Sequence, residues 1–227
     1  FRPSASAQAA LRAELAAFGL RTVSMQALLF GLPGAQLFGS AEQLAAFEQA
    51  IERAIDLAGT LDIANLVLGA PRNRAYPEAL TAADANARAG DILRRLGDRA
   101  LAAGARLAVE PAPVAYGTNF LNTVAQAAAF VAALDHPGVT LNFDLGALYQ
   151  NDEADRAEAL YDLAGGRVSH VHVSEPDLAA APADPGRLTA IAASLLARGY
   201  EGWFSIEMRE APDGGLEALE RALRDTA

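Results

Sequence analysis

The chain has 227 residues, of which 52% are hydrophobic and 20% are charged, values typical of a single soluble globular domain spanning residues 1–227. Its net charge of −10 argues against a nucleic-acid partner, which would require a basic surface. The chain has no Cys, and all 18 of its basic residues are Arg, so this sequence excludes disulfides, thiolate chemistry and any mechanism based on a Lys.

Segments typical of helices and strands alternate along the chain. A first helix is expected at 5–18, closed by Gly19. Six strand–helix pairs follow: 22–30 with 40–61, 65–71 with 81–103, 106–113 with 122–134, 139–146 with 152–164, 168–175 with 185–199, and 202–209 with 214–225. Ser40, followed by Glu42 and Gln43, predicts a capped helix start. Such alternation is typical of a parallel sheet covered by helices.

The polarity of the strands favours a barrel over an open, doubly wound sheet. Strands of an open sheet are apolar on both faces, because helices cover both. Here Leu141, Phe143 and Leu145 alternate with Thr140, Asn142 and Asp144, which indicates one apolar face and one mixed face. We therefore expect a (β/α)8 TIM barrel with the mixed face inside. Since such a barrel has eight strands, the first two are expected to be absent from this chain.

The stretch "VSHVHVSEP" (168–176) sends His170, His172 and Ser174 to the same face of a strand. Four residues share the inward parity near the carboxyl ends of four successive strands: Glu110, Asp144, His172 and Glu207. Three carboxylates at a barrel mouth would repel one another unless a cation joined them. Together with an imidazole they suit one divalent ion, Mn²⁺, Mg²⁺, Co²⁺ or Zn²⁺. In the alternative interpretation the four residues are unrelated: each buried carboxylate pairs with an Arg, and the His is a core residue with its own hydrogen-bond partners.

The series "LAVEP", "LNFDLG", "HVHVSEP" and "FSIEMR", with "LGAPRNR" upstream, resembles the sugar phosphate isomerase/epimerase family, which has a xylose-isomerase-like TIM barrel. The family includes ketose 3-epimerases and hydroxypyruvate and inosose isomerases. The resemblance implies that Glu110, Asp144, His172 and Glu207 hold the metal ion. It also implies that Glu110 and Glu207 act as the catalytic acid/base pair.

The function that follows is a metal-dependent isomerase or epimerase acting on a small sugar, a sugar phosphate or a related hydroxy-carbonyl compound. A proton moves at the carbon beside a chelated carbonyl, through an enediolate that the metal stabilises. Two positions depart from the ketose 3-epimerase branch, which has His and Arg where this chain has Ala147 and Leu178. These differences argue against epimerisation of a free ketose at C3.

The remaining polar residues near strand ends are candidates for substrate contact. They are Gln26, Arg72, Asn73, Asn119, His170, Glu175 and Arg209. Arg72 and Arg74 in "PRNR" could hold a carboxylate or phosphate, although a surface salt bridge explains Arg74 equally well. Glu175 has the wrong parity for the interior unless the strand end turns inward, and His136 is expected to be structural.

Other function classes stay open. An inosose-type dehydratase could use the same site, and a metal-stabilised sugar-binding protein would need no catalysis. A DNA-repair endonuclease with three zinc ions would need more than the 3 histidines present. The expected partner is a small carbohydrate substrate. The protein is expected in the cytoplasm, and a homo-oligomer is compatible with the sequence. A membrane is not expected, because no apolar run reaches the roughly 18 to 20 residues that a span requires.

Overall fold

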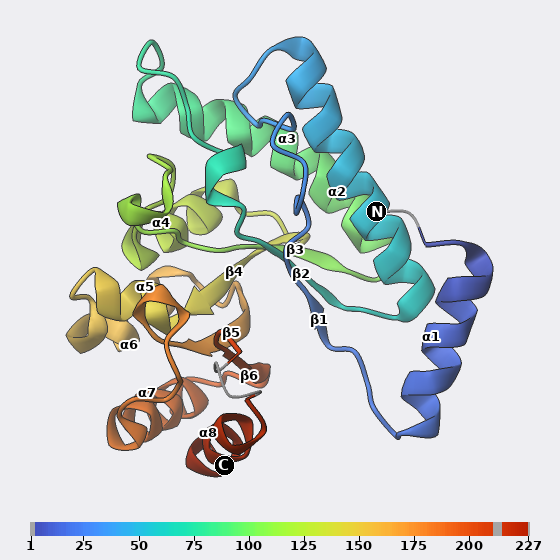
Figure 1. Cartoon of the computed structure of the whole chain (residues 1–227). Coiled ribbons are helices and arrows are strands. Elements are labelled where there is room, and N and C mark those ends of the chain that lie inside the picture. The colour runs from blue at the N-terminus through green and yellow to red at the C-terminus, as the bar shows by residue number, and fades with distance from the viewer. Residues whose placement is uncertain (1–2, 211–214, 227) are drawn as a thin grey trace.

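The computed structural model describes residues 3–210 and 215–226 and contains a curled sheet of six parallel strands (Figure 1). The strands are β1 (Ser24–Met25), β2 (Asn65–Leu68), β3 (Arg106–Val109), β4 (Val139–Asp144), β5 (Val168–Ser174) and β6 (Trp203–Glu207). They follow one another in chain order across the sheet, with a helical connection after each. The structure thus confirms the expected partial barrel of six βα units.

Eight α-helices are described: α1 (Ala5–Ala17), α2 (Ala41–Leu61), α3 (Ala82–Ala102), α4 (Val124–Leu134), α5 (Leu145–Gln150), α6 (Ala157–Leu163), α7 (Pro185–Ala197) and α8 (Leu216–Thr226). Four short 3₁₀ turns lie in the loops: η1 (Pro71–Asn73), η2 (Val114–Tyr116), η3 (Ala154–Arg156) and η4 (Pro176–Leu178). Within these described ranges, no helix is both long and apolar enough to cross a membrane.

The main core lies between the convex face of the sheet and the helices. Leu107 and Val109 of β3 and Leu141 and Phe143 of β4 are at most 1% exposed and belong to one apolar cluster with the inner faces of α2, α3 and α4. These residues are the apolar set of the strand alternation, so burial follows the period of two that the sequence shows.

The concave face holds a chain of polar side chains at the amino ends of the strands. Thr140 Oγ1 lies 2.7 Å from Ser169 Oγ, Ser169 donates to Asn65 Oδ1 at 2.8 Å, and Asn65 donates to Ser24 Oγ at 3.0 Å. These contacts join β1, β2, β4 and β5 across the interior, which is possible only because the sheet curls on itself. The pairing register shifts by one residue between β4 and β5, so Ser169 is an extra residue that reaches this interior beside His170.

The two edges of the curled sheet approach each other at its amino end. The Arg21 guanidinium, just before β1, lies 5.1 Å from the centre of the Trp203 ring at the start of β6. Helix α1 has no buried residue and contacts the molecule at the end of α2, where Arg12 donates to Thr60 O and forms an ion pair with Asp62. Strands β1 and β6 are the two edges of the described sheet and do not pair with each other, so the barrel is not closed between them.

Several segments differ from the sequence-based expectation. The expected strands 65–71 and 106–113 end at Leu68 and Val109. Only Ser24–Met25 of the expected strand 22–30 is extended, because turns with left-handed Ala27 and Gly31 follow. The expected strand 139–146 ends at Asp144, since the Asp144 side chain caps α5 by accepting from Ala147 N–H. In place of the single expected helix 152–164, the chain forms the 3₁₀ turn η3 followed by the shorter helix α6. Residue 214 of the expected last helix lies outside the described residues.

Candidate metal centre

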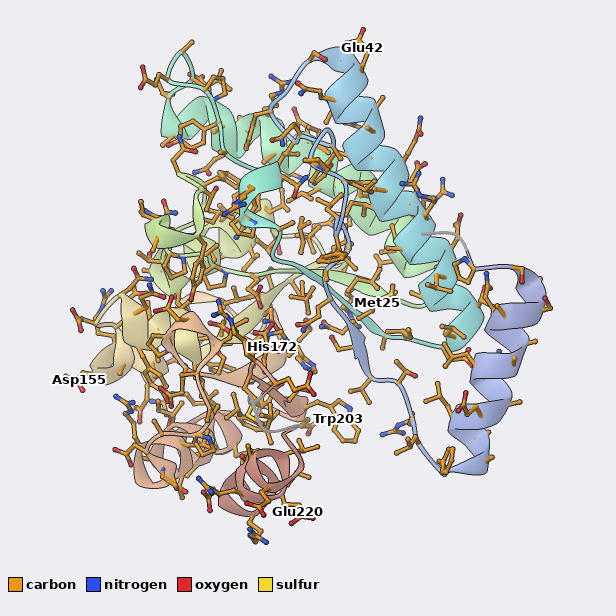
Figure 2. The ribbon with its side chains drawn as sticks, in the orientation of Figure 1. Met25, Glu42, Asp155, His172, Trp203 and Glu220 are labelled. Atoms are coloured by element: carbon orange, nitrogen blue, oxygen red, sulfur yellow. The ribbon has the colours of Figure 1, made fainter. Side chains whose placement is uncertain are left out.

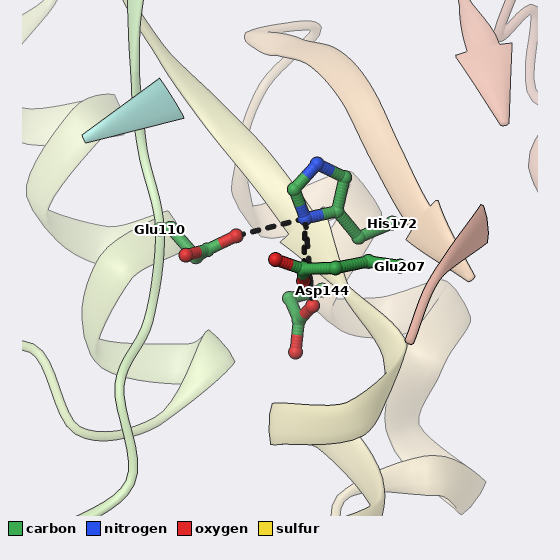
Figure 3. Close-up of side chains that lie close together, drawn as sticks. All are labelled: Glu110, Asp144, His172 and Glu207. Carbon is green, nitrogen blue, oxygen red and sulfur yellow. Dashed lines mark ion pairs between the residues drawn. The ribbon is translucent and has the colours of Figure 1, made fainter. Parts of the chain in front are cut away.

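Three carboxylates converge on the Nδ1 atom of His172 at the carboxyl end of the sheet (Figure 3). Glu110 Oε1 lies 2.9 Å from this nitrogen, Glu207 Oε2 3.1 Å and Asp144 Oδ2 3.8 Å. One donor atom from each of the four residues lies within 4.8 Å of all the others. The structure therefore brings together the set that inward parity on β3, β4, β5 and β6 predicts.

The position of each residue at the end of its strand explains the convergence. Glu110 directly follows β3 and its N–H donates to Leu68 O, which extends the pairing with β2 by one residue. Asp144 and Glu207 are the last residues of β4 and β6, and His172 lies inside β5. Carboxyl ends of parallel strands meet at one edge, so these side chains share one level of the barrel.

Asp144 is held by two hydrogen bonds. Its Oδ1 accepts from Ala147 N–H at 2.6 Å, and its Oδ2 accepts from Ser174 Oγ at 2.7 Å. Ser174 Oγ in turn accepts from Gly146 N–H at 2.8 Å. A Cβ at residue 146 would lie 2.8 Å from that oxygen, so only glycine allows this approach. The Asp144 carboxylate is thus oriented before any ion binds.

Glu110 is held from two sides. Asn142 Nδ2 donates to its Oε1 at 2.7 Å. Its Oε2 lies against β2, where a Cβ at Gly69 would come within 2.5 Å of it. The Glu110 carboxylate therefore lies close to the backbone at the end of β2. A residue larger than glycine at position 69 would narrow the space that the carboxylate occupies.

Burial and crowding shift the pKa values of the centre. Burial, together with the charge of Glu110, raises the pKa of Asp144 to about 7, against the opposing hydrogen bond from Ser174. Burial disfavours protonated His172, but the carboxylates of Glu110 and Glu207 close to its Nδ1 outweigh burial and raise the pKa of His172 to about 10. Without an ion, protons are thus needed to relieve the repulsion among the carboxylates.

These donors fit a divalent cation. His172 is 3% exposed, and its Nδ1 forms no well-aligned hydrogen bond although two carboxylate oxygens lie within 3.1 Å. One N–H cannot serve both oxygens well, whereas a cation among them would satisfy all the donors at once. Three carboxylates and one imidazole are hard and borderline ligands, as Mn²⁺, Mg²⁺, Co²⁺ and Zn²⁺ accept.

His170 lies deeper in the barrel and differs from His172 in its partners. Its Nε2 lies 2.9 Å from Ser205 Oγ, and its ring packs edge-on against that of His172 with centroids 5.4 Å apart. Burial and the charge of His172 lower the pKa of His170 to about 4, so its ring is neutral at physiological pH. A neutral ring bound to a hydroxyl is suited to hydrogen bonding with a polar ligand.

A cavity of ≈ 440 Å³ opens beside the centre, in the gap between β1 and β6. Its polar lining comprises Arg21, Thr22, Ser24, Gln26, His170, His172, Ser205 and Glu207. Of the residues expected to contact substrate, Gln26 and His170 thus lie next to the metal ligands. His172 lies inside the molecule, whereas Glu42, Asp155 and Glu220 project from its surface (Figure 2).

The other expected substrate residues lie outside this cavity. Asn73 donates to the carbonyls of Leu32 and Ala35, and the Asn119 amide pairs with the backbone of Tyr76, so both amides join loops. Glu175 is buried and accepts from Ala183 N–H. Arg72 and Arg209 are exposed, and Arg209 N–H donates to Leu178 O.

Arg74 is not on the surface, so a surface salt bridge is the wrong explanation for it. Its side chain is 1% exposed and donates to the carbonyl oxygen of Glu110. Tyr116 has no signal in the sequence, and its hydroxyl accepts from Asp177 N–H at 3.1 Å and joins η2 to η4. Asn142 and Ser174, which donate to Glu110 and Asp144, have such a signal in their inward parity on β4 and β5.

Comparison with known proteins agrees with this geometry. The model of one protein family, described as the xylose isomerase-like TIM barrel, matches residues 1–226. The chain belongs to this family. No curated protein matches it at a significant level of sequence similarity.

Several solved structures share the fold of this chain. The apo form of the 3-keto-D-glucoside 4-epimerase YcjR from E. coli has a TM-score of 0.76 and 19% identity, over 96% of this chain and 84% of that one. A D-psicose 3-epimerase has a TM-score of 0.75 and 21% identity, over 96% and 75%. An AP endonuclease, family 2, from Brucella melitensis has a TM-score of 0.71 and 19% identity, over 94% and 83%. At these identities the likeness establishes the fold and leaves the reaction to be argued from the site.

Proposed function

We propose that this protein is a divalent-metal-dependent isomerase or epimerase that moves a proton on a small sugar, sugar phosphate or related hydroxy-carbonyl compound. The observation that carries the proposal is the convergence of Glu110, Asp144 and Glu207 on His172 Nδ1 at the open end of the barrel. Structural neighbours that are named as sugar epimerases support the same class of reaction.

The divalent ion, when bound by Glu110, Asp144, His172 and Glu207, would stabilise negative charge on the oxygens of the substrate. Asp144, already held by Ser174 and Ala147, is suited to remain a fixed ligand. Asp144 and His172 then anchor the centre, which leaves the two glutamates for the proton transfer.

Glu110 and Glu207 reach the centre from β3 and β6, on different sides of His172 (Figure 3). Two carboxylates on different sides of a bound sugar can remove a proton from one face of a carbon and return one to the other face or to the neighbouring atom. The glutamate that accepts the proton has to be free of the ion at that moment, because a ligated carboxylate is a weaker base. With no Cys and no Lys in the chain, and with His172 among the metal donors, few other groups are available to act as the base.

The groups that line the cavity suit a polyhydroxylated ligand. Gln26, His170 and Ser205 offer neutral donors and acceptors beside Glu207 and His172. The exposed Arg72 and Arg209 stand at loop positions after β2 and β6, where a phosphate or carboxylate group at the far end of a substrate could reach them. Location in the cytoplasm and homo-oligomer formation stay predictions.

The proposal is tested by metal analysis followed by isotope exchange. Purified protein should bind one divalent ion per chain, and Asp144→Asn should lose tight binding, because it keeps a side chain that can cap α5 but removes the charge. Asp155→Asn is a matched control on the exposed surface. The loaded protein is then incubated in D₂O with keto sugars, sugar phosphates and inososes, and deuterium at the carbon next to the carbonyl is measured.

The outcomes separate the function classes. Deuterium in a recovered substrate or isomer supports the proposed proton transfer. Loss of water from an inosose would instead identify a dehydratase at the same site. One bound ion with neither exchange nor turnover of any of these compounds would favour a metal-stabilised sugar-binding protein. If Asp144→Asn retained full metal occupancy, the ligand set would be wrong.

A further inference from the structure

Arg74 is buried directly behind Glu110. The Arg74 side chain is among the largest fully buried side chains of the described residues, and its Nη2 donates to the backbone carbonyl of Glu110 at 2.5 Å. Burial lowers the pKa of Arg74 to about 10, and the charge of Glu110 opposes this shift, so the side chain stays cationic at neutral pH. A full positive charge therefore lies beside a metal ligand without solvent around it.

The local contacts of Arg74 do not offset the free-energy cost of removing its charge from water. Nε and Nη1 have no hydrogen-bond partner, and no carboxylate among the described residues forms an ion pair with the guanidinium. A buried, incompletely paired charge normally destabilises a fold relative to an apolar side chain of similar size. A single hydrogen bond to one carbonyl, which a neutral amide could also supply, does not explain why a charge is present.

The charge of the neighbouring centre does explain it. Glu110, Asp144 and Glu207 contribute three negative charges, and one divalent ion beside a neutral His172 balances two of them. One negative charge remains inside the barrel, where the low dielectric constant strengthens interactions between charges. Arg74 carries the one positive charge that is needed for neutrality.

We propose that Arg74 is the permanent counter-charge of the loaded metal centre and that it sets the preference of this centre for divalent over trivalent ions. The inference rests on the metal site proposed above. Arg74 acts as a positioning residue through Glu110 and through its field, without coordinating the ion. The field of Arg74 repels any cation in the centre, and this repulsion grows with the charge of the cation.

The test compares Mn²⁺ and Tb³⁺ binding in the full-length protein. Two neutral variants, Arg74→Met and Arg74→Gln, remove the charge, and the Gln variant can keep the hydrogen bond to the Glu110 carbonyl. Both should bind Mn²⁺ more tightly, by about tenfold, and Tb³⁺ by about thirtyfold, because the Coulomb energy scales with the charge of the ion. Arg74→Lys keeps the charge and should retain the wild-type ratio of the two affinities. Arg106→Gln, an exposed site at the opposite end of β3, should change neither affinity.

Calorimetry for Mn²⁺ and luminescence for Tb³⁺ give the dissociation constants, and circular dichroism of the metal-free variants checks their fold. Equal weakening of both ions in the neutral variants would show a purely structural role and overturn the proposal. The same would follow if Arg74→Lys behaved like Arg74→Met, or if both neutral variants failed to fold. If the wild type binds Mn²⁺ and the neutral variants keep its ratio of Mn²⁺ to Tb³⁺ affinity, this inference alone is refuted. If the wild type binds no ion, the proposed function is refuted as well.

Discussion

Ser174 Oγ donates a 2.7 Å hydrogen bond to Asp144 Oδ2 and accepts one of 2.8 Å from Gly146 N–H. The hydroxyl thus connects the end of β5 to the first turn of α5, across a space that only a glycine at position 146 leaves open. Because Asp144 is one of the four converging side chains, this hydroxyl orients a metal ligand without being one itself.

Ser174→Ala should therefore weaken Mn²⁺ binding by about 10- to 100-fold, the usual effect of losing a group that orients a ligand. Binding is measured by calorimetry at pH 7.5. Ser194→Ala, on α7 and remote from the centre, is the matched control and should leave the affinity unchanged. Wild-type affinity in Ser174→Ala would mean that Ala147 N–H alone holds Asp144.

The two histidines of β5 should respond differently to the same substitution. His172→Gln should lose metal affinity, since His172 Nδ1 lies at the point where the carboxylates converge. His170→Gln should keep the metal and lose turnover rate or stability, because His170 contacts Ser205 one layer deeper. Metal titration of both variants, together with thermal unfolding, distinguishes the two roles, and the reverse pattern would contradict the assignment.

Glu207→Gln should retain much of the metal binding and lose turnover by several orders of magnitude. The amide keeps an oxygen ligand but cannot accept a proton, and general acid–base groups contribute about 10²- to 10⁴-fold each. Turnover and deuterium exchange are measured in D₂O on the substrate that the screen identifies. An active Glu207→Gln enzyme, or turnover without exchange, would point to a hydride shift or to another base.

The metal-free protein should become less stable as the pH rises from about 6.5 to about 10. The folded-state pKa values of Asp144 and His172 are raised, to about 7 and about 10, so the native state binds more protons than the unfolded chain across this window. Between about pH 4 and 6.5 the lowered pKa of His170 opposes the raised pKa of Asp144, so stability should change little there. Stability that is complete below the unfolded-state pKa values is then lost as each group deprotonates in the folded protein. A bound ion replaces these protons, so the stabilisation by Mn²⁺ should increase with pH.

Thermal unfolding with EDTA and with Mn²⁺ at pH 5, 7 and 9 checks both trends. A double variant, Asp144→Asn with His172→Gln, should flatten the dependence of the metal-free protein on pH, because both raised pKa values are removed. A melting temperature of the metal-free wild type that increases toward pH 9 would show that Asp144 and His172 do not control the pH dependence.

The alternation of polar and apolar residues was sufficient to predict the barrel and the four converging residues. Side chains on a strand alternate with a period of two, and a parallel βα repeat places every strand end at one edge. Glu110, Asp144, His172 and Glu207 therefore follow from parity and position alone. The capping box of α2, with Ser40 and Gln43, is equally local and is confirmed.

The surroundings of the centre depend on contacts between segments far apart in the chain, and only the tertiary structure decided them. Arg74 in a polar loop has the sequence signature of a surface residue, yet the folding of η1 against the end of β3 buries it behind Glu110. Asn73 and Asn119 resemble site residues, but their amides are used by the backbones of loops more than 35 positions away. Local periodicity determines the direction in which a strand residue points, whereas loop packing determines which charge lies behind it and which amide remains available to a ligand.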